Sequence, residues 1–158
     1  MEKATCQVCG REIKASTGLI AHHGYTRPYE GWQTSSCAGA RYVPYEISCE
    51  RLKEVTEGVK SWITNQEIAL EDFLATPPQT ITVMERRSSW GKGEEVVYEK
   101  PEDFNPNSYK SSIPRTYENV YSNKKYDREQ ALKMSKYDLS NMERRIEEWT
   151  PVVVEVQA

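Results

Sequence analysis

The sequence has few of the residues that build a thick hydrophobic core. Leucine, isoleucine, valine and phenylalanine together supply only 28 of the 158 residues. So little aliphatic surface favours an elongated or cross-linked architecture over one large core. Ten tyrosines and four tryptophans partly compensate for the shortage.

Long apolar segments are also missing. The N-terminal stretch MEKATCQVCG contains no apolar region typical of a signal peptide. The longest apolar run near the end, PVVVEV, is far short of the roughly 20 residues that span a bilayer. We therefore expect a soluble, cytoplasmic protein with no membrane partner.

An excess of positive charge is absent as well. The formal net charge is −3 and the pI is about 5.6. Bulk electrostatic binding of nucleic acid usually needs a domain pI above about 9. Residues 1–44 nevertheless contain more basic than acidic side chains, so their composition is compatible with a local basic surface.

Motifs of common catalysts are not found. The sequence has no glycine-rich loop that cradles phosphates, no Ser-His-Asp set, and only two histidines. The many aspartates and glutamates are placed as on solvated helix faces. We therefore expect no enzymatic activity and no small-molecule substrate.

Metal-binding residue types do cluster near the start of the chain. They are Cys6, Cys9, His22, His23 and Cys37, with Cys49 a little further on. In a chain without a signal peptide, such a cluster indicates a metal site rather than disulfides.

The spacing Cys6-x2-Cys9-x12-His22 resembles the front half of a ββα zinc finger. Apolar Ile13 and Leu19 stand at the two positions that form the small core in that family. The resemblance covers residues 6–22, and it implies a β-hairpin followed by a short helix. It also implies that Cys6, Cys9 and His22 are ligands.

A short helix here would begin at Ser16 or Thr17 as its N-cap, and Gly24 would take the left-handed conformation beyond its end. On this helix His23 would point about 100° away from His22. We therefore expect His22 to bind the ion and His23 to lie at the surface or beside a ligand.

The fourth ligand departs from the family, which has a second histidine three to five residues further on. The next suitable residue is Cys37, and a Cys3His set forms a closed tetrahedral Zn²⁺ site. The sequence predicts one structural zinc per chain, bound by Cys6, Cys9, His22 and Cys37. Cys49 is the alternative for the fourth position. Four protein ligands leave no open position for catalysis.

The predicted finger helix lacks side chains that read DNA. The base-reading positions of the family correspond to Ala15, Gly18 and Ala21, which cannot hydrogen-bond to a base edge. The segment between the last two ligands and the residues after it are instead rich in arginine and aromatics: Arg27, Tyr29, Trp32, Arg41 and Tyr42. These could stack bases and bind phosphates, contact a protein, or fill the core of a small module.

Two later segments show helical periodicity. Apolar positions recur in steps of three and four over residues 45–75, at Leu52, Val55, Val59, Trp62, Gln66, Ala69 and Phe73. The same spacing recurs over residues 126–150, at Leu132, Ser135, Leu139, Met142, Ile146 and Trp149. This pattern predicts an antiparallel, coiled-coil-like helical hairpin, or else two amphipathic helices on a globular core.

The remaining segments complete the predicted domain organisation. Residues 76–125 are expected to form an inserted β-hairpin, turning near Gly91 and Gly93, followed by a loop over 101–125. Residues 151–158 should form a strand that returns to the zinc module of residues 1–44. The fold class is therefore α+β.

These features favour a non-enzymatic, zinc-stabilised interaction or regulatory protein. It would act through protein–protein contacts of the zinc head and the helical hairpin, either with a partner protein or as a homo-oligomer. The alternative is a nucleic-acid-binding accessory protein without sequence specificity, using the arginine- and aromatic-rich loop.

Overall fold

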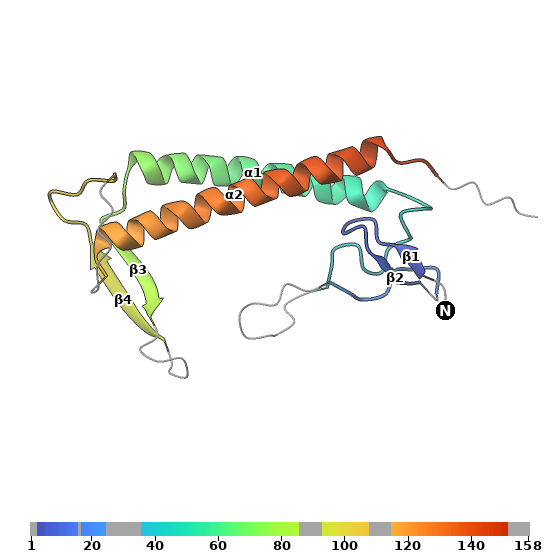
Figure 1. Ribbon diagram of the computed structural model, residues 1–158, viewed down its shortest axis with the longest axis horizontal. Coiled ribbons are helices and arrows are strands. Elements are labelled where there is room, and N and C mark those ends of the chain that lie inside the picture. The colour runs from blue at the N-terminus through green and yellow to red at the C-terminus, as the bar shows by residue number, and fades with distance from the viewer. Residues whose placement is uncertain (1–2, 16, 25–35, 86–92, 108–114, 152–158) are drawn as a thin grey trace, which may run out of the picture. The chain divides into compact units, whose positions relative to one another are not determined.

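The computed structural model describes residues 3–15, 17–24, 36–85, 93–107 and 115–151 (Figure 1). These residues contain two antiparallel β-hairpins and two long helices, as the α+β class predicted. The order is β1 (Lys3–Thr5), β2 (Glu12–Lys14), α1 (Glu50–Ala75), β3 (Thr80–Glu85), β4 (Glu94–Glu99) and α2 (Tyr117–Glu147). Within the described ranges, neither helix has an apolar stretch long enough to cross a membrane.

The chain forms two compact units. The first unit comprises residues 1–62 and 135–158, and the second comprises residues 63–134. Each unit therefore contains part of α1 and part of α2.

The first unit is built on the short hairpin of β1 and β2. Its register places Lys3 opposite Lys14, Ala4 opposite Ile13 and Thr5 opposite Glu12. A small core of buried Cys6, Ala15 and Ile20 lies beside it, with Ala4, Val8, Ile13 and Cys37 packed around these three. The predicted hairpin of the head is therefore present.

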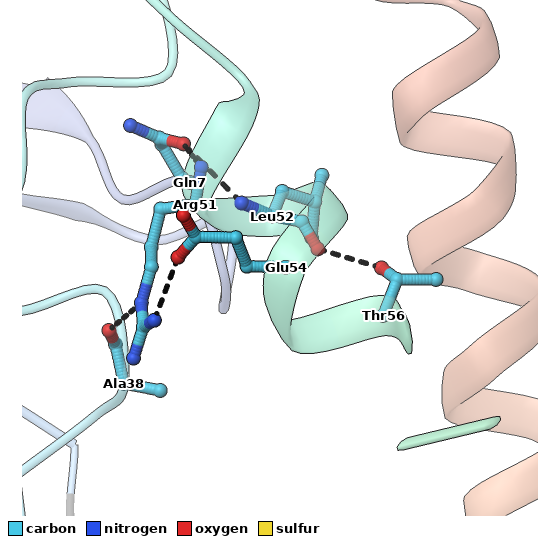
Figure 2. Close-up of polar contacts among 6 residues, drawn as sticks. All are labelled: Gln7, Ala38, Arg51, Leu52, Glu54 and Thr56. Carbon is cyan, nitrogen blue, oxygen red and sulfur yellow. Dashed lines mark hydrogen bonds and ion pairs between the residues drawn. The ribbon is translucent and has the colours of Figure 1, made fainter. Parts of the chain in front are cut away.

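The first turn of α1 is held by Gln7, which lies in the turn between β1 and β2 and is only 1% exposed. Its Oε1 accepts hydrogen bonds from the backbone N–H groups of Arg51 (2.9 Å) and Leu52 (3.3 Å), as Figure 2 shows. These groups have no acceptor within the helix, because the first four N–H groups of any helix lack one. The Gln7 amide also donates to the Val43 carbonyl at 2.8 Å. A distant side chain thus caps the helix.

The last turns of α2 are attached to the same β1–β2 turn. Arg145 donates from Nη1 to the Val8 carbonyl (2.8 Å) and from Nη2 to the Cys6 carbonyl (3.3 Å). Its guanidinium also lies 4.7 Å from the centre of the Tyr45 ring. Trp149 Nε1 donates to the Tyr45 carbonyl at 2.6 Å.

The second unit has a separate aromatic core. Phe73 of α1 stacks on Tyr121 of α2 with ring centres 4.7 Å apart. Phe104 meets the rings of Tyr117 and Tyr121 edge-on at 5.0 Å. Ile81 and Val120 complete the buried set. The hairpin of β3 and β4 covers this core, which agrees with the hairpin predicted within residues 76–125.

The helix boundaries differ from those predicted. Helix α2 begins at Tyr117, so residues 117–125 are helical and not part of a loop. Tyr117, Val120 and Tyr121 recur at three- and four-residue spacing and are buried, which stabilises these first turns. Helix α1 begins at Glu50, five residues later than predicted. Along it, Ile63 is buried, whereas the predicted seam residue Trp62 is 41% exposed.

The short helix implied by the zinc-finger resemblance is not formed over residues 17–24, which make turns and bends. Gly18 has a φ of +77°, outside the right-handed helical region. Ile20 exchanges backbone hydrogen bonds with a distant segment, through Arg41 N–H to the Ile20 carbonyl and Ile20 N–H to the Tyr42 carbonyl. These long-range bonds replace the local bonds of a helix. The predicted strand at 151–158 lies outside the described residues, apart from Pro151.

Replacement of Phe73 with alanine should destabilise the second unit, because it removes the stacked partner of Tyr121. We expect the free energy of unfolding to fall by about 3 to 5 kcal/mol, measured by urea denaturation followed by circular dichroism. The neighbouring Leu74, which is 39% exposed, is the matched control, and Leu74→Ala should cost less than about 1 kcal/mol. Equal losses in the two variants would contradict the assigned core.

Candidate metal centre

Four side chains of the first unit converge on one point. The ligand atoms of Cys6, Cys9, His23 and Cys37 all lie within 4.8 Å of one another. The Sγ atoms of Cys6 and Cys37 are 3.9 Å apart, and Cys9 Sγ lies 3.3 Å from His23 Nε2. Zinc–sulfur bonds of about 2.3 Å in a tetrahedron would separate two sulfurs by about 3.8 Å. The cluster therefore has the size and donor set of a single metal site.

Cys6 and Cys9 are positioned by the tight turn between β1 and β2. Gly10 N–H donates to the Cys6 carbonyl at 3.0 Å, and Cys6 N–H donates to the Arg11 carbonyl at 2.9 Å. Gly10 has a φ of +71°, which a glycine adopts without the steric cost of a Cβ atom. We refer to this segment, residues 6–10, as the Cys6–Gly10 turn.

Cys37 reaches the cluster from a second loop. Its N–H donates to the His23 carbonyl at 2.7 Å, which fixes these two ligands relative to each other. Two residues later, Gly39 packs directly on the cluster, because a Cβ atom there would overlap with Cys6 Sγ. Only glycine fits at this position. Gly24 has a φ of +63°, so its predicted left-handed conformation is confirmed, although no helix precedes it.

The structure brings His23 to the cluster and places His22 elsewhere. His23 Nδ1 lies 2.7 Å from the Ala21 carbonyl oxygen, which can only accept, so Nδ1 must donate. Its Nε2 lone pair is then available to an ion, an arrangement typical of histidine ligands.

His22 forms a different set of hydrogen bonds. Its Nε2 accepts from Arg41 Nε at 2.8 Å, and its Nδ1 lies 2.6 Å from Ser36 Oγ. The choice of His22 from the sequence assumed a helix, in which neighbouring side chains point about 100° apart. Because residues 17–24 are not helical, that premise is wrong and the geometry favours His23 as the ligand.

Cys49 does not belong to the cluster. Its side chain is 1% exposed, and its carbonyl accepts the hydrogen bond of Lys53 N–H in the first turn of α1. It therefore packs as a small buried side chain.

The cysteines differ in acidity when no metal is bound. Burial raises the pKa of the Cys6 thiol to about 12, although backbone hydrogen bonds from Cys9 and Val8 oppose the rise. Burial also acts to raise the pKa of Cys9, but hydrogen bonds from the side chain and backbone of Arg11 outweigh it and lower the pKa to about 6. At neutral pH Cys9 is thus a thiolate ready to bind a metal, whereas Cys6 must release its proton to the solvent on binding.

Of the five residues predicted to bind a partner, Arg27, Tyr29 and Trp32 lie outside the described residues. Arg41 and Tyr42 are described and exposed. The Arg51 guanidinium lies 4.5 Å from the centre of the Tyr42 ring, so it covers one face of that ring. The nucleic-acid alternative for these five residues stays a prediction.

Sequence reasoning missed three residues that support the site, namely Gln7, Gly39 and Arg145. Gly39 alone had a local signal, since a glycine two residues after a ligand cysteine suits a close approach to sulfur. Gln7 and Arg145 act over 44 and 137 residues of sequence, and no spacing rule reaches that far.

Comparison with known proteins gives no relative for this chain. No family model, no curated protein and no solved structure matches it.

The zinc content of two alanine variants can show which histidine is the ligand. We expect His23→Ala to lose most of the bound zinc, because it removes one of four donors, while His22→Ala should keep about one zinc per chain. Elemental analysis of the purified variants measures this directly. Zinc loss in His22→Ala together with retention in His23→Ala would restore the assignment made from the sequence.

Gly39→Ala should weaken the site without touching a ligand atom. The added methyl group would displace Cys6 Sγ, and we expect zinc affinity to fall about 10- to 100-fold, as for other supporting residues of metal sites. Competition with a chromophoric chelator measures the affinity. Gly58→Ala is the matched control, because a Cβ atom there meets nothing within 4 Å. Equal affinities in the two variants would contradict the close packing of Gly39.

Proposed function

We propose that this chain is a non-enzymatic interaction protein whose head is folded around one structural Zn²⁺. The support is the donor set, three thiols and one imidazole within 4.8 Å. Soft thiolate ligands favour zinc over harder cations, and four protein ligands close a tetrahedral site. A closed site stabilises a fold and leaves no position for a reacting water.

The zinc would support the helices through the loops that carry its ligands. Gln7 in the Cys6–Gly10 turn caps α1, and Arg145 of α2 binds the carbonyls of that turn. Arg51 of α1 donates from Nε to the Ala38 carbonyl (3.0 Å), next to Cys37 (Figure 2). Metal binding is thus linked to the placement of the first turn of α1 and the last turns of α2.

We further infer that α1 and α2 form the predicted antiparallel hairpin. Two contacts support it, one within each unit. In the first unit Lys60 of α1 lies 3.2 Å from Glu143 of α2. In the second unit Phe73 of α1 stacks on Tyr121 of α2.

A groove on the first unit is the surface that carries this proposal. It has a volume of about 490 Å³ and is lined by Arg51, Glu54, Val55, Gly58, Val59 and Trp62 of α1 and by Ser135 of α2. Trp62 is 41% exposed. Tryptophan is among the residue types that most often anchor protein interfaces, so an exposed tryptophan in this groove favours a binding role. A lining that combines Val55, Val59 and Trp62 with the charged Arg51 and Glu54 fits an amphipathic helix.

The proposed occupant is a helix of another protein molecule, and a second copy of this chain is the simplest case. The full-length, zinc-loaded protein should then be a dimer by light scattering in both about 0.1 M and about 0.5 M salt, because apolar contacts are not screened. Trp62→Ala should shift the mass to that of a monomer. The control Tyr126→Ala removes an aromatic side chain that is 60% exposed on the second unit, and it should leave the mass unchanged.

A monomeric wild-type protein would assign the groove to a different partner. Wild type and Trp62→Ala, used as paired baits in an extract of the native host, should then differ in one captured protein. Identical capture by the two baits would overturn the groove as the interaction surface.

A further inference from the structure

A second pocket lies on the first unit, outside the metal cluster. It has a volume of about 430 Å³. Apolar Leu19, Ile20 and Ala21 line it together with the polar or charged side chains of Lys14, Thr17, His22 and Arg41. The proposed function uses none of these residues.

Backbone hydrogen bonds join residues 14–22 to the distant segment at residues 41 and 42 and so form this pocket. Ala21 N–H donates to the Lys14 carbonyl at 2.9 Å, and Arg41 N–H donates to the Ile20 carbonyl at 2.7 Å. Ile20 N–H donates to the Tyr42 carbonyl at 2.9 Å, and the Ile20 side chain is 1% exposed. The base of the pocket is therefore fixed by the fold.

Arg41 is held in place at a conformational cost. Its φ is +66°, a region that is unfavourable for residues other than glycine. Its Nε donates to His22 Nε2 at 2.8 Å, so the remaining ring proton of His22 resides on Nδ1 and is donated to Ser36 Oγ at 2.6 Å. A neutral His22 thus orients the guanidinium and leaves its two Nη groups for another acceptor.

Positive charge accumulates around the pocket. Lys3 stands directly opposite Lys14 in the β1–β2 hairpin, although like charges at such a pair are destabilising. Within residues 3–15, 17–24 and 36–47, the charged side chains are Lys3, Arg11, Lys14 and Arg41 against Glu12 and Glu46, and Arg11 is hydrogen-bonded to Cys9. Among the ion pairs of the described residues, none involves Lys14 or Arg41. An anion in the pocket would offset this repulsion.

We propose that this pocket binds a phosphate group. The Nη groups of Arg41 offer the paired donors that phosphate oxygens accept, Lys14 supplies a second positive charge, and the Thr17 hydroxyl is a further donor. The phosphate belongs either to a nucleic-acid backbone or to a small free phosphate. This inference does not depend on the groove at Trp62, so the two can fail separately.

The test compares matched variants of the full-length, zinc-loaded chain. Arg41→Asn removes the charge but keeps a residue that tolerates positive φ. Lys14→Gln removes the second charge at an exposed position. Lys133→Gln, exposed on α2 in the second unit, removes the same charge elsewhere. Zinc content is measured for each variant, and titration calorimetry uses inorganic phosphate in one arm and a short single-stranded oligothymidylate in the other.

The proposal predicts that wild type and Lys133→Gln bind at least one of the two probes. Arg41→Asn and Lys14→Gln should bind that probe about tenfold or more weakly, since each loses a charge-assisted hydrogen bond. Binding of phosphate alone indicates a small phosphate ligand, and binding of the oligonucleotide indicates a nucleic-acid backbone. Absence of binding to both probes, or equal binding by Arg41→Asn and Lys133→Gln, overturns the proposal. If Arg41→Asn loses zinc, the comparison is made with Lys14→Gln instead. Equal binding by Lys14→Gln and Lys133→Gln then overturns the proposal.

Discussion

The Cys6–Gly10 turn is the element on which the rest of the first unit depends. Within it are two thiols of the candidate metal cluster, the amide that caps α1 and the carbonyls that accept from Arg145. A buried amide such as that of Gln7 is costly unless it is hydrogen-bonded, and here Arg51, Leu52 and Val43 supply partners for both its oxygen and its nitrogen. A displacement of this turn would leave several of these groups without partners at once.

The shortage of aliphatic residues is met in two ways. The first unit has a buried cluster of only three side chains, and a metal ion held by the candidate site would supply cross-links that such a core cannot. The second unit uses aromatic area instead, with Phe73, Phe104, Tyr117 and Tyr121 packed together. Tyrosine thus takes the place that leucine holds in most helical cores.

Local patterns in the sequence were sufficient for several features. The Cys-x2-Cys spacing predicted the hairpin at the head, and the apolar periodicity predicted most of α1 and α2. Local patterns failed where a distant segment decides the backbone conformation. Residues 17–24 carry a finger-like spacing, but Ile20 pairs with residues 41 and 42, and this pairing turns His23 rather than His22 toward the cysteines. The start of α2 carries a helical spacing at Tyr117, Val120 and Tyr121, but this short local pattern was missed, and the stacking partner Phe73 lies far back in the chain.

The contacts of Arg145 also affect the order in which the protein can assemble. The carbonyls of Cys6 and Val8 are separated from this side chain by 139 and 137 residues of sequence. Contacts of such long range form late and slow the folding of small domains. During synthesis, which runs from the N-terminus, the ligand cysteines leave the ribosome long before Arg145 does. The nascent head therefore lacks these two hydrogen bonds until α2 has been synthesised.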